Sequence, residues 1–233
     1  MEFTAFASGS AGNLYRLSDG TTPLLLEAGL PIKAIRQALS FRLSAIRAAL
    51  ISHEHMDHAK GASDVMKAGV DCYMTAGTAK AVGLSGLRLH TMDPLKQFRI
   101  GTWTVLPFPT EHDAAEPVGL LLASDTGERA VYLTDTAYCR YRFSGLSLVA
   151  LEANYSQEIL DENVAAGTVA RELRDRIRRS HMSLETALGF LKANDLSRVR
   201  EIHLLHLSST NADPQAFRRA VMEATGVPTY IAR

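Results

Sequence analysis

The segment His53–His58 reads His-Glu-His-Met-Asp-His and directly follows an apolar, strand-like run. On an extended segment, residues two apart point to the same side, so His53 and His55 can bind one ion. If the chain then turns into a helix, Asp57 and His58 swing round towards a second ion. Neutral imidazole suits zinc, iron or manganese, and a carboxylate favours a harder ion or bridges two. A histidine-rich surface loop is the alternative, but four ligand-type side chains at this spacing rarely arise by accident, so the segment predicts a metal site.

Other histidines and acids stand where a strand gives way to a loop, or a loop to a helix. Open α/β sheets present ligands at such places. Each of these side chains taken singly could be a hydrogen-bonded structural residue, but together with His53–His58 they complete two coordination spheres. By contrast, His90 and His203 have no such context, and His203 is expected to be a packed or edge histidine. The candidates are His112, Asp135, His181 and His206.

Short apolar segments alternate with helical patterns along the chain, and this alternation indicates a layered α/β architecture. Ser183 and Asp213 are placed to cap two of the helices, with Pro214 at a first helical position. Strands are expected at residues 3–7, 13–17, 23–27, 48–52, 72–75, 102–108, 118–124, 130–134, 146–152, 201–207 and 229–232. Helices are expected at about residues 32–39, 59–68, 78–82, 158–177, 183–194 and 214–225.

The overall composition is that of a globular protein. With 233 residues, of which 46% are hydrophobic and 21% charged, the chain is expected to form one domain over residues 1–233. No apolar run approaches the roughly 20 residues that cross a bilayer, so no membrane partner is expected. The N-terminus lacks the basic start and apolar stretch of a signal peptide. Cys72 and Cys139 are too few for a disulfide framework, which makes a reducing cytoplasm the expected location.

The charges balance, with 25 Lys and Arg against 25 Asp and Glu. This balance counts against a broad electrostatic grip on long nucleic acid, since clustered positive charge supplies most non-specific affinity. A local basic run between Asp161 and Arg179 is the exception. It could bind phosphate, or it could be a solvated helix face with ion pairs between neighbouring turns. Its arginines are Arg171, Arg174, Arg176, Arg178 and Arg179.

The order of these motifs resembles the metallo-β-lactamase superfamily. The string His-x-His-x-Asp-His is followed by an isolated His, a strand-terminal Asp and a late strand-terminal His, as in that family. The segment Ser8–Asn13, Ser-Gly-Ser-Ala-Gly-Asn, resembles the start of its YycJ/WalJ (VicX) branch. So do the segments Leu151–Tyr155, Ser180–Ser183 and His206–Ser208. The similarity runs in the right order from residue 6 to about residue 211.

The resemblance implies an αββα sandwich, with two mixed β-sheets flanked by helices and a dinuclear metal site at one edge. Glu27 stands where the family usually has Asp, and Leu184 stands where Asn is common; neither position is a metal ligand. By family pattern His53, His55 and His112 hold the first ion, Asp57, His58 and His206 hold the second, and Asp135 bridges them. Zinc or manganese is expected, and iron or nickel also suits such donors.

The implied activity is that of a dinuclear metal-dependent phosphodiesterase, in this branch a 5′-to-3′ exonuclease on DNA. A hydroxide bridging the two ions attacks phosphorus in line. Asp57 could also orient this nucleophile. The leaving oxygen needs a proton, for which His181 is the candidate, because related phosphodiesterases carry a His-Ser-Thr element ahead of a helix at this place. Glu152 could orient or protonate His181.

The substrate-binding candidates are weaker signals. The Ser8-Gly9-Ser10 loop offers hydroxyls and a backbone without Cβ at Gly9, which can approach a phosphate closely. Asn154 and Asn211 are candidates for polar lining of the same site.

Other functions remain open at this point. A small-molecule phosphodiesterase acting on cyclic nucleotides is the main rival, because the chain has zero net charge and no added nucleic-acid-binding domain. Thioester or lactam hydrolysis is disfavoured by His181 and the phosphate-type loop at Ser8–Ser10. An oxygen-reducing diiron protein is disfavoured by His55, where that class has Glu. A non-catalytic scaffold is disfavoured because scaffold relatives lose ligands, whereas this chain keeps all of them.

Overall fold

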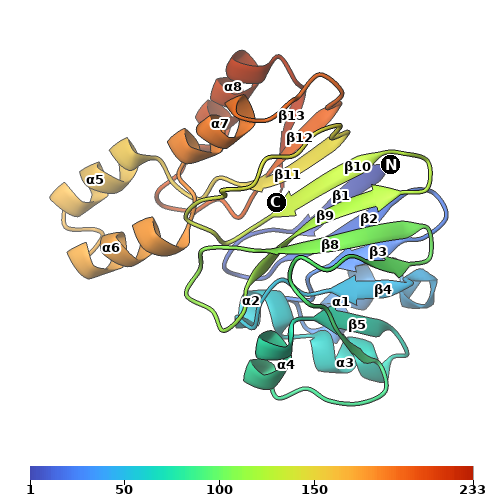
Figure 1. The fold of residues 1–233 in the computed structure, drawn as a ribbon. Coiled ribbons are helices and arrows are strands. Elements are labelled where there is room, and N and C mark those ends of the chain that lie inside the picture. Colours follow the sequence, from blue (N-terminus) through green and yellow to red (C-terminus); the bar gives the residue numbers. More distant parts are fainter. Residues whose placement is uncertain (233) are drawn as a thin grey trace. The chain divides into compact units, whose positions relative to one another are not determined.

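The computed structural model describes residues 1–232 and contains two mixed β-sheets flanked by helices, as the sequence predicted (Figure 1). The strands are β1 (Glu2–Ala7), β2 (Leu14–Ser18), β3 (Leu24–Leu26), β4 (Ala48–Leu50), β5 (Asp71–Met74), β6 (Leu89–Thr91), β7 (Phe98–Ile100), β8 (Trp103–Pro109), β9 (Val118–Ser124), β10 (Arg129–Leu133), β11 (Leu148–Glu152), β12 (Glu201–Leu205) and β13 (Thr229–Ile231). The helices are α1 (Ile32–Ala38), α2 (Met56–Ala59), α3 (Ala62–Lys67), α4 (Ala76–Val82), α5 (Gln157–Ala165), α6 (Arg171–Ser180), α7 (Leu184–Lys192) and α8 (Pro214–Thr225).

Residues 1–109 and 114–128 form the first of two compact units. Its six-stranded sheet has the order β1-β2-β3-β4-β5-β6. The pairs β1–β2 and β2–β3 are antiparallel, whereas β3–β4, β4–β5 and β5–β6 are parallel. Every residue of β3 and β4 is buried, which explains why these parallel strands read as unbroken apolar runs. Ile35 of α1 and Val65 of α3 pack with Leu25 and Ala49 in one core.

Residues 110–113 and 129–232 form the second unit. The strands β10, β11, β12 and β13 pair in parallel in that order. Helices α7 and α8 pack side by side, and α5 packs against α6 (Figure 1). The carboxyl ends of parallel strands meet at one edge, so the residues that follow β10, β11 and β12 are brought together there.

The local signals for the starts of two helices are confirmed. The Ser183 hydroxyl accepts the Thr186 N–H at the start of α7, 3.2 Å away. The Asp213 carboxylate accepts the N–H groups of Gln215 and Ala216 at the start of α8, with Pro214 in the first turn.

The helix expected at residues 158–177 is wrong, because the structure has two helices there, α5 and α6. Gly167 adopts a left-handed backbone with φ 75°, and the N–H groups of Thr168 and Val169 both bond to the Asn163 carbonyl. A helix cannot continue through this geometry, and helical periodicity on either side does not reveal the break. The short strands β6 and β7 were also missed, since three residues carry too little pattern.

The chain was expected to form one domain over residues 1–233. The division into two compact units does not test this expectation, which stays a prediction. Within residues 1–232, no helix combines the length and apolarity needed to span a membrane.

Candidate metal centre and acid–base residues

In the first unit, the His53–His58 segment passes from extended chain into a helical turn; this helix begins at Met56, three residues before the expected start at residue 59, and it is separate from α3. Strand β4 ends at Leu50 and α2 begins at Met56, so His53 and His55 lie on extended chain while Asp57 and His58 lie in the first helical turn. His53 Nε2 and His55 Nδ1 are 3.1 Å apart. Two imidazole nitrogens at this separation can both bind one cation, for which Zn–N distances are about 2.0–2.1 Å.

Buried polar groups hold the histidines of this segment in place. The Ser52 hydroxyl lies 2.9 Å from His53 Nδ1, which leaves Nε2 of that ring for a cation. Glu27 is fully buried, its Oε2 accepts the Ser52 N–H at 3.2 Å, and the same oxygen lies 3.6 Å from His58 Nδ1. Glu27 therefore contacts the ligand segment even though the family usually has the shorter Asp there.

Asn13 is a site residue to which sequence reasoning assigned no role. Its Nδ2 lies 3.0 Å from His58 Nε2 and 3.2 Å from the Asp57 carbonyl, and its Oδ1 accepts the Gly9 N–H at 2.9 Å. This buried amide ties the Ser8–Ser10 loop to the ligand segment. Its place as the final Asn of Ser-Gly-Ser-Ala-Gly-Asn was the available signal.

Of the predicted phosphate loop, Ser10 is exposed, and the Ser8 hydroxyl is hydrogen-bonded to the Tyr15 hydroxyl at 2.7 Å. Substrate binding by Ser8, Gly9 and Ser10 stays a prediction.

Gly29 permits the close approach of this loop to the ligand segment, and its replacement tests that approach. A Cβ at Gly29 would lie 1.7 Å from the Asp57 carbonyl oxygen and 2.6 Å from the Asn13 nitrogen. Gly29→Ala is therefore expected to lower the free energy of unfolding by about 1–3 kcal/mol, because backbone must shift. Chemical denaturation measures this change, and metal titration follows the displaced Asp57. Gly189→Ala in α7, where nothing lies within 4 Å of the added Cβ, is the control and should stabilise by about 0.5–1 kcal/mol. Equal stability of the two variants would contradict the account.

In the second unit, four donors from four elements converge. Asp135 follows β10, Glu152 ends β11, His181 follows α6 and His206 follows β12. Each offers a ligand-type atom, and these atoms lie within 4.8 Å of one another. Asp135 and His206 have left-handed backbones, with φ 44° and 53°. Such strain in non-glycine residues persists where the surroundings hold it, and it aims both side chains off the strand ends into the cluster.

Glu152 and His181 form a buried acid–base pair. Glu152 Oε1 accepts from His181 Nδ1 at 2.7 Å, and its Oε2 accepts the N–H groups of Thr136 and Met182 at 2.9 and 3.1 Å. Burial opposes a charge on His181, but the charge and hydrogen bond of Glu152, with Asp135 nearby, raise the pKa of this imidazole to about 9. His181 thus holds a proton at neutral pH that it can give away.

His112 has the opposite character. Its Nδ1–H donates to the Ser180 carbonyl at 2.7 Å, and its Nε2 lies 3.4 Å from an Asp113 oxygen and 3.7 Å from Asp135 Oδ2. Burial lowers the pKa of His112. The ring is therefore neutral with its lone pair on Nε2, which is the form that binds a metal.

Asn154 holds the His206 turn. Its side-chain amide donates to the His206 carbonyl at 2.8 Å and lies 3.2 Å from His206 Nδ1, with 7% of the residue exposed. Substrate binding by Asn154 stays a prediction. His90 and His203 lie apart from the donor clusters and stack on Tyr73 and Tyr230, and His203 is buried, as expected of a packed histidine.

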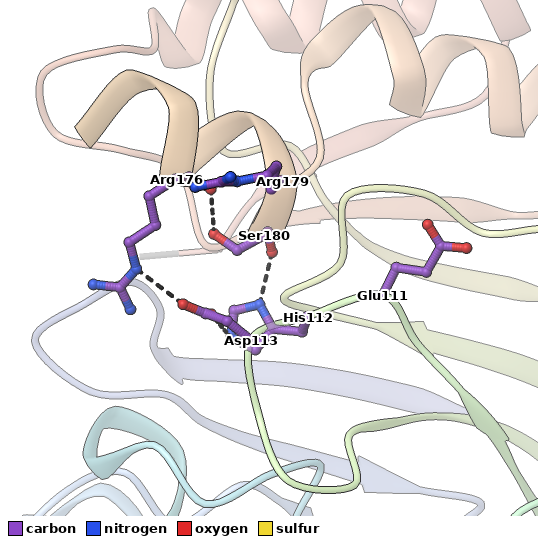
Figure 2. A pocket seen from close by; sticks show the side chains of 6 residues that line it. All are labelled: Glu111, His112, Asp113, Arg176, Arg179 and Ser180. Atoms are coloured by element: carbon purple, nitrogen blue, oxygen red, sulfur yellow. Dashed lines mark hydrogen bonds and ion pairs between the residues drawn. The ribbon is translucent and has the colours of Figure 1, made fainter. Parts of the chain in front are cut away.

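A pocket of about 430 Å³ borders His112 (Figure 2). Figure 2 shows Arg176 reaching from α6 to Asp113, where Nε and Oδ2 are 2.9 Å apart. Arg179 lies one turn further along the same helix face. The full lining is Glu111, His112, Asp113, Arg176, Arg179 and Ser180.

Much of the basic run forms ion pairs, as the solvated-face alternative expected. Arg174 pairs with Asp175, and Arg178 pairs with Asp161 at 2.8 Å. Arg171 and Arg179 have no carboxylate partner among residues 1–232. Of these two, only Arg179 lines the pocket.

Comparison with known proteins agrees with this fold. The model of the beta-lactamase superfamily domain matches residues 24–205, and the chain belongs to that superfamily. Exodeoxyribonuclease WalJ of Streptococcus pneumoniae is 31% identical over 227 residues, covering 90% of this chain and 82% of that protein. Exodeoxyribonuclease YycJ of Bacillus anthracis is 26% identical over 239 residues, covering 96% and 88%. These relatives put the chain in the WalJ/YycJ-like branch.

Among solved structures, the metallo-β-lactamase fold protein YhfI of Bacillus subtilis matches with a TM-score of 0.77 at 16% identity, covering 99% of this chain and 95% of that one. This likeness shows the fold, and the predicted fold class is confirmed. The protein is a metal-dependent hydrolase. The fold implies divalent metal ions, and the paired imidazoles of the first unit and the carboxylate–imidazole cluster of the second have the donor chemistry to hold them.

Proposed function

We propose that the protein is a DNA exonuclease that hydrolyses phosphodiester bonds from the 5′ end. The observation that carries this proposal is the Glu152–His181 pair, a protonated imidazole held in the same cluster as the ligand candidates Asp135 and His206. The alkoxide released from a phosphodiester is a poor leaving group and needs such a proton, whereas the thiolate released from a thioester needs none. The names of the WalJ and YycJ relatives support DNA as the substrate.

We assign two divalent ions, zinc or manganese, to this site. The ions would neutralise the negative charge of the phosphate. They would also lower the pKa of a metal-bound water towards neutrality. The assignment follows the motif order of the superfamily. It is supported by the neutral imidazole of His112, whose free lone pair is on Nε2. The proposed ligands are His53, His55 and His112 for one ion, Asp57, His58 and His206 for the other, and Asp135 shared between them.

His181 then acts as the general acid. Glu152 accepts a hydrogen bond from the Nδ1–H of His181, which leaves the Nε2–H to donate its proton to the departing sugar oxygen. After the transfer the imidazole is neutral and still held by Glu152. Asp57 is proposed to orient the attacking water, and the Ser8–Ser10 loop and Asn154 to contact the phosphate.

An assay panel tests the proposed function. The purified protein is stripped of metal, reloaded with Mn²⁺ or Zn²⁺, and given single- and double-stranded DNA, RNA, 2′,3′- and 3′,5′-cyclic nucleotides and a thioester. We expect metal-dependent release of mononucleotides from the 5′ end of DNA. Faster turnover of a cyclic nucleotide than of DNA would favour the small-molecule phosphodiesterase that the zero net charge of the chain leaves open. Binding of less than one equivalent of metal would favour a scaffold.

Arg179 tests whether the pocket beside His112 binds a phosphate of the strand. Arg179→Ala should weaken DNA binding and reduce the slope of log affinity against log salt by about 1, because one phosphate contact is lost. Arg171→Ala is the matched control: this arginine is on the same helix, also lacks a carboxylate partner among the described residues, and lies outside the pocket. Fluorescence anisotropy over a salt series gives both slopes. If the two variants lose the same slope, α6 contributes only general charge.

A further inference from the structure

The connection between β10 and β11, residues 134–147, contains a stretch, Tyr138–Phe143, in which aromatic and basic side chains are interleaved. The ligand candidate Asp135 is the second residue of this connection, which has no helix or strand of its own. Connections this long within compact folds are uncommon and are usually functional. The interleaved residues are Tyr138, Arg140, Tyr141, Arg142 and Phe143.

Hydrogen bonds hold this connection in place, one of them within it and two to the residues that follow α7. The Thr136 hydroxyl donates to the Tyr138 carbonyl at 2.8 Å. Arg142 donates to the Ala193 carbonyl at 2.7 Å, and the Phe143 N–H donates to the Asn194 side chain at 2.6 Å. A ring presented on a fixed backbone loses little entropy when a ligand binds.

Tyr138 is presented to solvent beside a cavity. It is 54% exposed, although an aromatic ring gains stability only when it is buried. The cavity has a volume of about 360 Å³, in the range of small-ligand pockets. Its lining includes Tyr138, Arg140, Tyr141, Arg142, Phe190 and Asn194.

The charges around this cavity favour an anionic ligand. Arg142 bonds only to a carbonyl oxygen among the described residues. Arg140 pairs with Glu111 at 2.7 Å, but the two side chains are 69% and 46% exposed, and such exposed pairs contribute little stability. Arg140 can therefore exchange Glu111 for a phosphate. Glu111 lines the pocket beside His112 together with Arg179 (Figure 2), and Arg140 lines the second cavity, so this ion pair joins one lining residue of each.

We propose that Tyr138–Phe143 is a stacking platform for an unpaired base of the nucleic-acid strand bound at the active site. Aromatic rings take up the face of any base and nearby arginines hold the backbone, which is how proteins bind single strands without reading sequence. The platform rests on the proposed function, since it requires a nucleic-acid substrate. It makes that substrate a strand whose bases are unpaired beside the cut, with little preference among the four bases.

The test compares Tyr138→Leu, which removes the π-face, with Tyr138→Phe, which keeps it. The metal-loaded protein binds a single-stranded oligonucleotide with hydrolysis-resistant phosphorothioate linkages and a 3′ fluorescein, followed by anisotropy. Tyr138→Leu should weaken binding by about 5- to 150-fold, the range for one base–aromatic stack. Tyr138→Phe should bind as the parent does. Tyr230→Leu is the matched control, because Tyr230 is 48% exposed on β13 and lies outside the cavity.

A second experiment tests whether the loss of affinity in Tyr138→Leu comes from the loss of a contact with a base. A series of oligonucleotides is compared, each with one abasic site at a different position. For the parent protein, an abasic site at one particular position should weaken binding. For Tyr138→Leu, an abasic site at that position should not change the affinity.

The platform is overturned if Tyr138→Leu binds the strand as the parent does, or if it weakens binding of a free mononucleotide while leaving strand binding unchanged. These outcomes are separable from failure of the exonuclease proposal. Tyr138-dependent binding without degradation of DNA would support the platform and contradict the exonuclease proposal. Degradation of DNA without Tyr138-dependent binding would support the exonuclease proposal and contradict the platform.

Discussion

Asp135→Asn is expected to reduce phosphodiester hydrolysis at least about 1,000-fold while the fold is retained, since Asp135 is the proposed ligand of both ions and its loss would remove most of the electrostatic catalysis. The Asp135 carboxylate is 3% exposed, with its oxygens 3.8 Å from His206 Nδ1 and 3.7 Å from His112 Nε2. Asparagine keeps the shape and can still accept the 2.7 Å hydrogen bond from the Thr134 hydroxyl. The loss is therefore one of charge and metal affinity, measured by kcat/KM and by metal content per protein.

Two further variants complete this experiment. His55→Ala should cause a comparable loss, because it removes a proposed ligand contributed by the first unit. His90→Ala is the control, since His90 is partly exposed beside Asp71 and outside the donor clusters. Circular dichroism and thermal unfolding check that each variant folds. Near-normal turnover by Asp135→Asn or His55→Ala would refute the dinuclear assignment.

His181→Ala is expected to slow cleavage of DNA by about 10²–10⁴-fold, the usual contribution of general acid catalysis. Hydrolysis of bis-p-nitrophenyl phosphate should fall much less, because p-nitrophenolate leaves without a proton. The ratio of the two losses, measured as kcat on each substrate, reports the acid role. Equal losses on both substrates would show that His181 binds metal or substrate instead.

Glu152→Gln separates the pairing with His181 from the fold. Glutamine keeps the volume and one acceptor for the buried N–H groups of Thr136 and Met182, but it removes the charge that raises the pKa of His181. We expect the same substrate-dependent pattern as for His181→Ala, with a smaller loss on DNA. A uniform loss on both substrates with lowered thermal stability would indicate that Glu152 only supports the strand ends.

Some site features are local and were predictable from the sequence. The direction of His53 and His55 follows from the alternation of an extended chain, whereas the helix that carries Asp57 and His58 begins three residues before the start expected from the sequence. The caps at Ser183 and Asp213 bond to N–H groups only two or three residues away. Such features depend only on residues that are close together in the sequence.

Other features join distant parts of the chain and were decided only by tertiary structure. The contact of Asn13 with Asp57 spans 44 residues, and the hydrogen bond from His112 to the Ser180 carbonyl spans 68. No local pattern reports such partners, because packing of whole elements creates them. The break between α5 and α6 at Gly167 likewise escaped helical periodicity.

The division has a chemical meaning for this protein. The sequence by itself determined which side chains can bind cations or carry protons, because that depends on residue type and local spacing. Only the tertiary structure decided their states: the Ser180 carbonyl sets the neutral tautomer of His112, and Glu152 keeps His181 protonated. Protonation and tautomer depend on burial and on charges and hydrogen bonds within a few ångströms, and those neighbours are assembled by the fold.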